Sequence, residues 1–207
     1  MFSAIRSRVI EYIILANALM FIAQLAYGRA ASEYFALTPA YVFQMPWTIL
    51  TSMFMHAGFE HILMNMFFGV FMFGSYLQQI IGEREFTNVY FLGGLAASLF
   101  YVAVSLVFGL PNPLVSAVGA SGAVFAIVGA LIVLQPNMKI YLYFLFPMPL
   151  WVFGLLYMLY SIVAIPTQLS GGTAVTAHVG GLVAGLMMGK LLQRPPEQPK
   201  YTYVRYY

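Results

Sequence analysis

The stretch Val118-Gly119-Ala120-Ser121-Gly122-Ala123 leads from a turn of small residues into an apolar segment, and the rest of the chain is interpreted around it. A serine between two glycines at the start of a hydrophobic segment is an unusual place for a hydroxyl. Taken alone, Ser121 is best explained as a helix cap or a small packing residue. It would act as a nucleophile only if a base lies within reach, so the other polar residues must decide between the two interpretations.

The composition is that of a membrane protein. Of the 207 residues, 62% are hydrophobic and only 7% are charged, whereas a soluble domain has about 25% charged residues. We therefore expect an all-α integral membrane protein that forms a single bundle. The sequence has no cysteine, which excludes disulfides and thiolate catalysis, and it has no aspartate. The net charge of +3 is small and scattered, so nucleic acid is not an expected partner.

Six apolar segments predict a bundle of six transmembrane helices, since a helix needs about 20 residues to cross a bilayer. The fourth segment is shorter, and Pro147 and Pro149 interrupt the start of the fifth. The first linker, residues 28–55, mixes aromatic and polar side chains and is expected to lie along the membrane interface. We expect one membrane domain over residues 1–194 and a disordered cytoplasmic tail over 195–207. The six segments are residues 9–27, 59–80, 86–108, 121–134, 140–165 and 176–192.

The distribution of positive charge predicts the orientation. Six helices place both termini on one side of the membrane, and eight of the nine Lys and Arg residues fall on that side, Arg29 being the exception. Both termini are therefore expected in the cytoplasm, with the protein in a plasma or inner membrane. No cleavable signal peptide is expected, because the first apolar segment contains Glu11 and lacks a convincing cleavage site.

With this orientation, polar residues from distant parts of the chain lie near the outer face. His61 and Asn65 lie one helical turn apart near the outer end of the second segment, whereas Ser121 and His178 lie at the outer ends of the fourth and sixth. Ser121 is about 21 Å along the helix axis from Gln135, which places it on the order of 10 Å below the outer boundary of a core about 30 Å thick. Polar groups at this depth are costly, and they indicate a functional site.

Small residues are expected to bring two of these segments together. His178, Gly181 and Gly185 share one narrow face of the sixth segment, and such a glycine pattern lets another backbone approach closely. Gly122 begins a second small-residue face beside Ser121. We expect the two faces to pack against each other and to carry the histidine against the serine.

This arrangement predicts nucleophilic catalysis by a Ser121–His178 dyad, because neutral imidazole is the base suited to physiological pH. No aspartate exists to orient the histidine, and the six glutamates lie elsewhere. The N–H groups at the start of the fourth helix, with the side chains of His61 and Asn65, are candidates for stabilising an oxyanion. His56 points elsewhere and is expected to tie the first linker to the bundle.

Other interpretations remain open for the individual residues. A buried hydrogen bond between helices explains His178 as well as catalysis does, and helix packing explains Asn65. A zinc site is disfavoured because His56 and His61 do not share a helical face and no H-E-x-x-H motif occurs. The absence of aspartate excludes an intramembrane aspartyl protease. No metal and no cofactor are expected.

Over nearly its whole length the chain resembles the rhomboid intramembrane serine proteases, in a minimal six-span form of prokaryotic type. Three motifs carry the resemblance: Gly119-Ala120-Ser121-Gly122 is similar to G-x-S-G, His56 with His61 to Asn65 is similar to H-x-x-x-x-H-x-x-x-N, and Ala177 to Gly181 with Gly185 is similar to A-H-x-x-G-x-x-x-G.

The resemblance implies a role for each motif residue. Ser121 would be the nucleophile and His178 the general base. The oxyanion would be stabilised by a set that comprises His61, Asn65, Gly119 and the backbone of Ser121. Structural support would come from His56, Gly122, Gly181 and Gly185.

The resemblance also implies the substrate: transmembrane proteins in the lipid bilayer, cut in or near their membrane helices close to the outer face. Two positions depart from the family pattern. Thr48 follows Trp47 where the family has arginine, and Gln78 stands where it has glutamate. The resemblance implies a structural role for both positions. The loop at 166–175, rich in Ser, Thr and Gly, is expected to be a mobile lid.

The sequence disfavours two rival classes of protein. A non-catalytic relative that binds membrane helices is disfavoured because both Ser121 and His178 are present. A small channel or transporter is disfavoured because the polar residues gather at one end of the bundle, and no internal repeat is seen.

Overall fold

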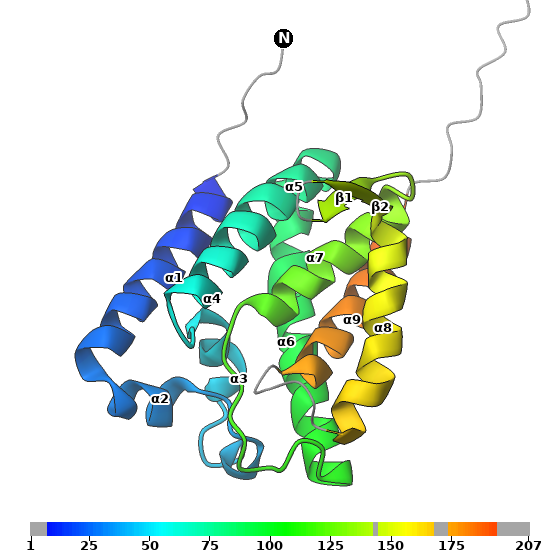
Figure 1. Cartoon of the computed structure of the whole chain (residues 1–207). Coiled ribbons are helices and arrows are strands. Elements are labelled where there is room, and N and C mark those ends of the chain that lie inside the picture. The colour runs from blue at the N-terminus through cyan, green and yellow to red at the C-terminus, as the bar shows by residue number, and fades with distance from the viewer. Residues whose placement is uncertain (1–7, 143–144, 168–173, 194–207) are drawn as a thin grey trace, which may run out of the picture.

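The computed structural model describes residues 8–142, 145–167 and 174–193 of the chain. The predicted tail and most of the predicted lid, residues 168–173, therefore lie outside the described residues. Nearly all regular structure in the described part is helical, as Figure 1 shows, which confirms the all-α fold class. Four described helices are long and apolar enough to cross a membrane. A fifth crossing is present if the bent pair Thr48–Phe54 and Phe59–Ile81, whose arms meet at 92°, is one span.

The helices begin and end close to the predicted segments, except at the start of the fifth. α7 has only 14 residues and is therefore a shorter apolar helix that is not among the four long ones. The second segment is one continuous helical rod that changes to π-helical geometry in its middle. Its parts are α4 (Phe59–Leu63), η3 (Met64–Gly74) and α5 (Ser75–Ile81), and the other long helices are α1 (Arg8–Tyr27), α6 (Glu83–Phe108), α7 (Ser121–Leu134), α8 (Leu150–Thr167) and α9 (Val175–Leu192).

The structure corrects the prediction for the fifth segment. The chain from residue 140 does not begin a helix but forms an antiparallel hairpin of β1 (Lys139–Leu142) and β2 (Phe146–Pro149), and α8 begins only at Leu150. Pro147 and Pro149 account for this, because proline lacks an N–H group and holds the preceding residue in an extended conformation. Pro166, predicted to start the loop, lies instead within the last turn of α8.

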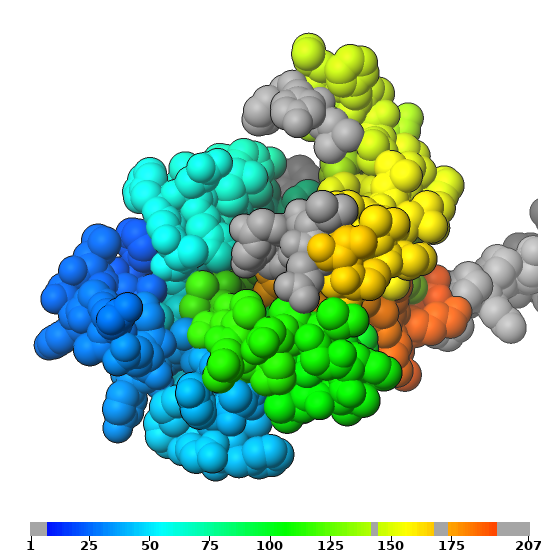
Figure 2. Space-filling view, turned by 60° about the horizontal axis from the view of Figure 1, so that its bottom comes forward, coloured from blue at the N-terminus to red at the C-terminus, as the bar shows by residue number. Residues whose placement is uncertain are grey.

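The two ends of the bundle differ in structure. The loop end carries α2 (Arg29–Phe35), η1 (Pro39–Tyr41), α3 (Thr48–Thr51), η2 (Ser52–Phe54) and residues 109–120. Figure 2 looks onto this end and shows the blue linker segments beside the green segment that follows α6. The opposite, hairpin end carries the start of α1, the α5–α6 turn, the hairpin and the end of α9 (Figure 1).

Backbone and side-chain hydrogen bonds anchor the first linker at the loop end. Leu37 and Ala117 exchange two backbone hydrogen bonds of 3.1 and 2.8 Å. Trp47 donates from Nε1 to the carbonyl of Tyr34 at 2.9 Å and stacks on its ring. Thr48, which departs from the family pattern, is buried and donates to the carbonyl of Met45 at 2.7 Å. The linker is thus held without the arginine that the family has at this position.

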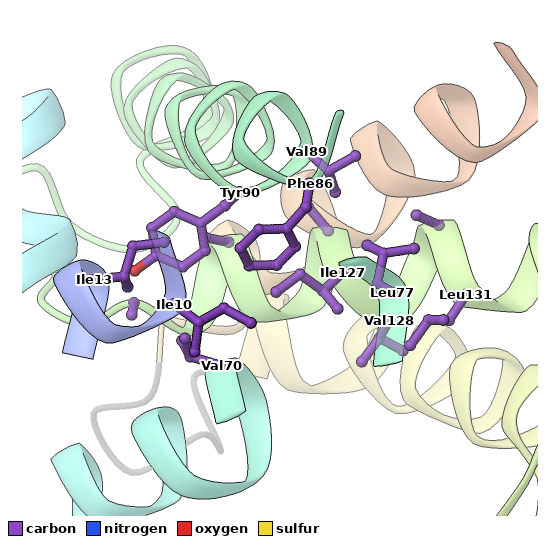
Figure 3. Packing of buried hydrophobic residues seen from close by; sticks show 14 of the residues in the cluster. Ile10, Ile13, Val70, Leu77, Phe86, Val89, Tyr90, Ile127, Val128 and Leu131 are labelled. Carbon is purple, nitrogen blue, oxygen red and sulfur yellow. The ribbon is translucent and has the colours of Figure 1, made fainter. Parts of the chain in front are cut away.

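The main core lies where α1, η3, α5, α6 and α7 meet (Figure 3). Large side chains from four of these elements fill it around α7, which also contacts α8 and α9. In a bilayer such packing is the main attraction between helices, because lipid is as apolar as the side chains. The labelled residues are Ile10 and Ile13 from α1, Val70 from η3, Leu77 from α5, Phe86, Val89 and Tyr90 from α6, and Ile127, Val128 and Leu131 from α7.

α7 and α9 approach each other with almost no side chain between their backbones. A Cβ atom added to Gly181 would collide with the carbonyl oxygen of Gly122, and one added to Gly185 would collide with that of Ala126. The two small-residue faces therefore pack as the sequence predicts, and the first turn of α9 lies against the start of α7.

Gly185→Ala is expected to lower the free energy of unfolding by about 1–3 kcal/mol, the usual cost of overpacking a tight contact. The added methyl meets the backbone of Ala126, which cannot rotate away as a side chain can. Thermal unfolding in detergent measures this effect. Gly58→Ala is the matched control, because the backbone there is extended and nothing lies within 4 Å of the added Cβ. Equal unfolding temperatures for the two variants would contradict the described contact.

Candidate active site

A constrained glycine turn places Ser121 at the first position of α7. Gly119 has φ +127°, a backbone conformation that L side chains rarely adopt, and its N–H donates to the carbonyl of Ser52 at 2.9 Å. A Cβ atom at residue 119 would also lie only 2.8 Å from Cε1 of His61. Conformation and space therefore both require glycine here, and the turn directs the chain into the helix with the serine at its start.

Ser121 and His178 meet in this structure. The Nε2 atom of His178 lies 2.6 Å from Oγ of Ser121, within the range for a nucleophile and its base. His178 lies in the first turn of α9 and is 7% exposed. The close approach of α7 and α9 makes this distance possible, because bulky residues at the crossing would hold the helices apart.

Two aromatic side chains that the sequence analysis did not identify surround the imidazole. Phe125 stacks on it with ring centroids 4.5 Å apart and planes inclined by 14°. The hydroxyl of Tyr157, from α8, lies 2.7 Å from Nδ1 of His178. Phe125 lies four residues after Ser121 and hence on the same helical face, so the spacing alone predicts that Phe125 lies near the site. Nothing in the sequence singles out Tyr157.

His61 presents a donor toward the start of α7. Its Nδ1 accepts a hydrogen bond from the backbone N–H of Ala57 at 3.3 Å, so the neutral ring carries its proton on Nε2. That nitrogen faces Gly119, beside Ser121. Asn65 is buried one turn further along and donates from Nδ2 to the carbonyl of His61 at 2.9 Å. The two side chains thus lie on the same side of the serine, as the spacing predicts.

The predicted role of Gly119 in stabilising an oxyanion needs a correction. Its N–H already donates to the carbonyl of Ser52, so it is not available to another acceptor. The first hydrogen bond of α7 runs from Val124 N–H to the carbonyl of Ala120. The N–H groups of Ser121 and of the two residues after it precede that bond and have no acceptor within the helix. The contribution of Gly119 is therefore to the shape of the turn.

His56 ties the first linker to α1 through its backbone. Its N–H donates to Oε1 of Gln24 at 2.8 Å, and its carbonyl accepts from Nε2 of the same side chain at 3.0 Å. The imidazole is 2% exposed and packs edge-on against His61. Burial, with the neighbouring His61 as a second cause, lowers the pKa of His56 to about 4, so the ring is neutral at physiological pH.

A cavity of about 1000 Å³ opens beside the pair of Ser121 and His178. It lies between η3 and α8, with one side of α7 as its floor, and it extends to β1 at the hairpin end. Its walls are predominantly apolar, and the polar groups of the site gather at one end. Lining residues include His61, Asn65, Phe68, Val128, Lys139, Leu150 and Phe153. The cavity runs along α7 from Ser121 to Val128.

Comparison with known proteins establishes the family. A family model described as the rhomboid domain matches residues 44–195, which include every residue of the site described above. The chain belongs to the rhomboid family. This agrees with the resemblance stated from the motifs, although the minimal prokaryotic subtype is not established by the match.

Relatives occur in plants, fungi and bacteria. RHOMBOID-like protein 12, mitochondrial, of Arabidopsis thaliana is 30% identical over 65% of this chain and 43% of its own length. Rhomboid protein 1, mitochondrial, of Saccharomyces cerevisiae is 30% identical over 74% and 44%. Rhomboid protease GluP of Bacillus subtilis is 30% identical over 72% and 26%. The chain thus spans under half the length of these relatives. Another match is named an inactive rhomboid-like protein.

Proposed function

We propose that this rhomboid protein is an intramembrane serine protease that cleaves transmembrane proteins with a Ser121–His178 dyad. The observation that carries the proposal is the 2.6 Å contact between Oγ of the serine and Nε2 of the histidine. A relative without catalysis would not need the two atoms at this distance, at the end of a cavity of this size.

The proposed reaction is acyl transfer in two steps. His178 Nε2 takes the hydroxyl proton while Ser121 Oγ attacks the scissile carbonyl, and the proton is then given to the leaving amine. In the second step Nε2 takes a proton from water while the water oxygen attacks the acyl carbon, and Nε2 then returns the proton to Ser121 Oγ as the acyl–oxygen bond breaks. The oxyanion formed in each step would be stabilised by the first N–H groups of α7, with Nε2–H of His61 and the amide of Asn65 as side-chain donors.

The cavity and the membrane support the proposed substrate class. A cavity with predominantly apolar walls beside the dyad suits an apolar peptide segment that enters from the bilayer. An intact helix keeps its carbonyls in its own hydrogen bonds, so the segment must unwind locally before attack. The proposed partners are therefore the lipid bilayer and transmembrane proteins whose helices unwind readily near the site.

We place the catalytic end of the bundle toward the outside of the cell. Among the described Lys and Arg residues, the hairpin end carries Arg8, Arg84, Lys139 and Lys190, and the loop end carries Arg29. Positive charge accumulates on the cytoplasmic side, which favours a cytoplasmic hairpin end in a plasma or inner membrane. The dyad lies at the start of α7, toward the loop end, and would act near the outer face.

Cleavage in liposomes tests the proposed function. The purified chain is reconstituted with a single-span substrate that carries a helix-weakening glycine pair in its outer half, and the products are mapped by mass spectrometry. One cut near the outer boundary is expected, with a lower rate when the glycine pair is replaced by leucines. A substrate that binds and stays intact would favour the rival role of a non-catalytic helix-binding protein.

A further inference from the structure

The hydroxyl of Tyr157 forms a hydrogen bond with the imidazole of His178, 2.7 Å from Nδ1. The other imidazole nitrogen of His178 faces Ser121 Oγ at 2.6 Å. The tyrosine ring is half-buried and packs against Phe125, with centroids 4.4 Å apart, while Phe125 stacks on the imidazole. Serine, histidine and tyrosine thus form a continuous chain of hydrogen bonds that joins α7, α9 and α8.

We propose that Tyr157 is a positioning residue that orients the imidazole of His178 and accepts a hydrogen bond from its Nδ1 during catalysis. The proposal rests on the function proposed above. To accept the serine proton, Nε2 must carry a lone pair, and the proton of a neutral imidazole must then be on Nδ1. Nδ1–H donates to the hydroxyl oxygen of Tyr157 in this state. A carboxylate occupies this place in many serine hydrolases, and this chain has no aspartate to fill it. The tyrosine hydroxyl differs from a carboxylate because it can also donate, so it must accept only once the ring is charged.

The same hydrogen bond strengthens during the reaction. When Nε2 takes the serine proton, the ring becomes a cation and both nitrogens are donors, so Tyr157 can only accept. A hydrogen bond from a charged donor is stronger than one from a neutral donor. The contact is therefore more favourable in the transition state than in the resting site, which raises the rate of the chemical step rather than the affinity for substrate.

α8 supplies a matched control for the test. Tyr160 lies three residues further along the same helix, 47% exposed, and its ring is 6.0 Å from that of Tyr157. Tyr157→Phe and Tyr160→Phe remove the same hydroxyl from neighbouring positions of one helix. A general effect of the substitution on α8 would appear in both variants, whereas the loss of the bond to His178 appears only in the first.

The first measurement is the cleavage rate in liposomes. Tyr157→Phe is expected to lower kcat by about 10- to 100-fold, the effect of losing one hydrogen bond to a charged group. KM is expected to stay within about twofold, because the lost contact acts on the transition state. Tyr160→Phe should keep both constants. A Tyr157→Phe variant with unchanged kcat, or with a loss confined to KM, would overturn the proposal while leaving the proposed protease function standing.

The second measurement does not depend on cleavage. The chain has only three histidines, so the nitrogen NMR spectrum of protein with labelled histidine can be assigned by substitution. Wild-type His178 is expected to show a protonated Nδ1 and an unprotonated Nε2. The Tyr157→Phe protein should show a mixture of tautomers. A wild-type His178 protonated mainly on Nε2 would overturn the proposal, whether or not the chain cleaves any substrate.

Discussion

Ser121→Ala is expected to abolish cleavage of a membrane-embedded substrate, with a loss of at least about 10⁴-fold in kcat, because no acyl-enzyme can form without the hydroxyl. The alanine side chain fits the same space, so α7 and its contacts should be unchanged. The measurement is the initial rate of product formation in liposomes, with thermal unfolding as the check on folding.

Ser116→Ala is the matched control for this variant. Ser116 lines the same cavity, but its hydroxyl bonds to Oγ1 of Thr38 at 2.8 Å. Loss of the Ser116 hydroxyl should leave the cleavage rate within a few-fold of wild type, since the substitution removes only one exposed hydrogen bond. A Ser121→Ala protein that cleaves at a rate comparable to the Ser116→Ala control would show that another group attacks the peptide.

His178→Ala is expected to cause a loss of the same order, because the hydroxyl of Ser121 then has no base at 2.6 Å. The protein should remain folded, since the contact between α7 and α9 continues through Gly181 and Gly185 beyond the lost imidazole. The variant is compared with wild type in the same liposome assay, and its folding is checked by thermal unfolding.

The double variant makes this test more specific. If the serine and histidine act as one unit, Ser121→Ala with His178→Ala should have the same residual rate as either single variant. Losses that multiply instead would show that the two residues act independently, which contradicts the dyad. A normal rate for His178→Ala alone would assign the base to a different residue.

Much of the fold was predictable because lipid imposes strict limits on the sequence. A chain that crosses the bilayer must satisfy its backbone within helices, so the apolar segments predict the long helices to within a few residues, except at the start of α8. The hairpin before Leu150 was missed because its apolar residues continue the pattern of the segment that follows. Pro147 and Pro149 predict a break in the helix, but two prolines do not by themselves indicate that the chain before α8 forms strands.

The meeting of Ser121 and His178 was also predictable, and the reason is the spacing of the glycines. Gly181 and Gly185 repeat at helical intervals from the histidine, so they specify which face of α9 approaches α7 and how closely. Depth in the membrane then brings the two polar side chains to one level. Both facing helices carry a pattern of small residues, so the sequence indicates both sides of the contact.

The details of the site required the three-dimensional structure. The commitment of the Gly119 N–H to Ser52 depends on how the first linker packs beneath the turn, and no local pattern encodes it. Tyr157 reaches His178 only through the relative rotation of α8 and α9. In a segment as rich in aromatic residues as α8, the sequence does not reveal which tyrosine faces the site.

Covalent labelling of the purified protein with a fluorophosphonate probe tests the central claim most directly, because such a probe reacts with a serine only when a base activates it. We expect wild-type protein in detergent to gain one probe adduct, mapped by mass spectrometry to Ser121, and we expect Ser121→Ala and His178→Ala to gain almost none. A wild-type protein that labels no faster than Ser121→Ala would contradict the account.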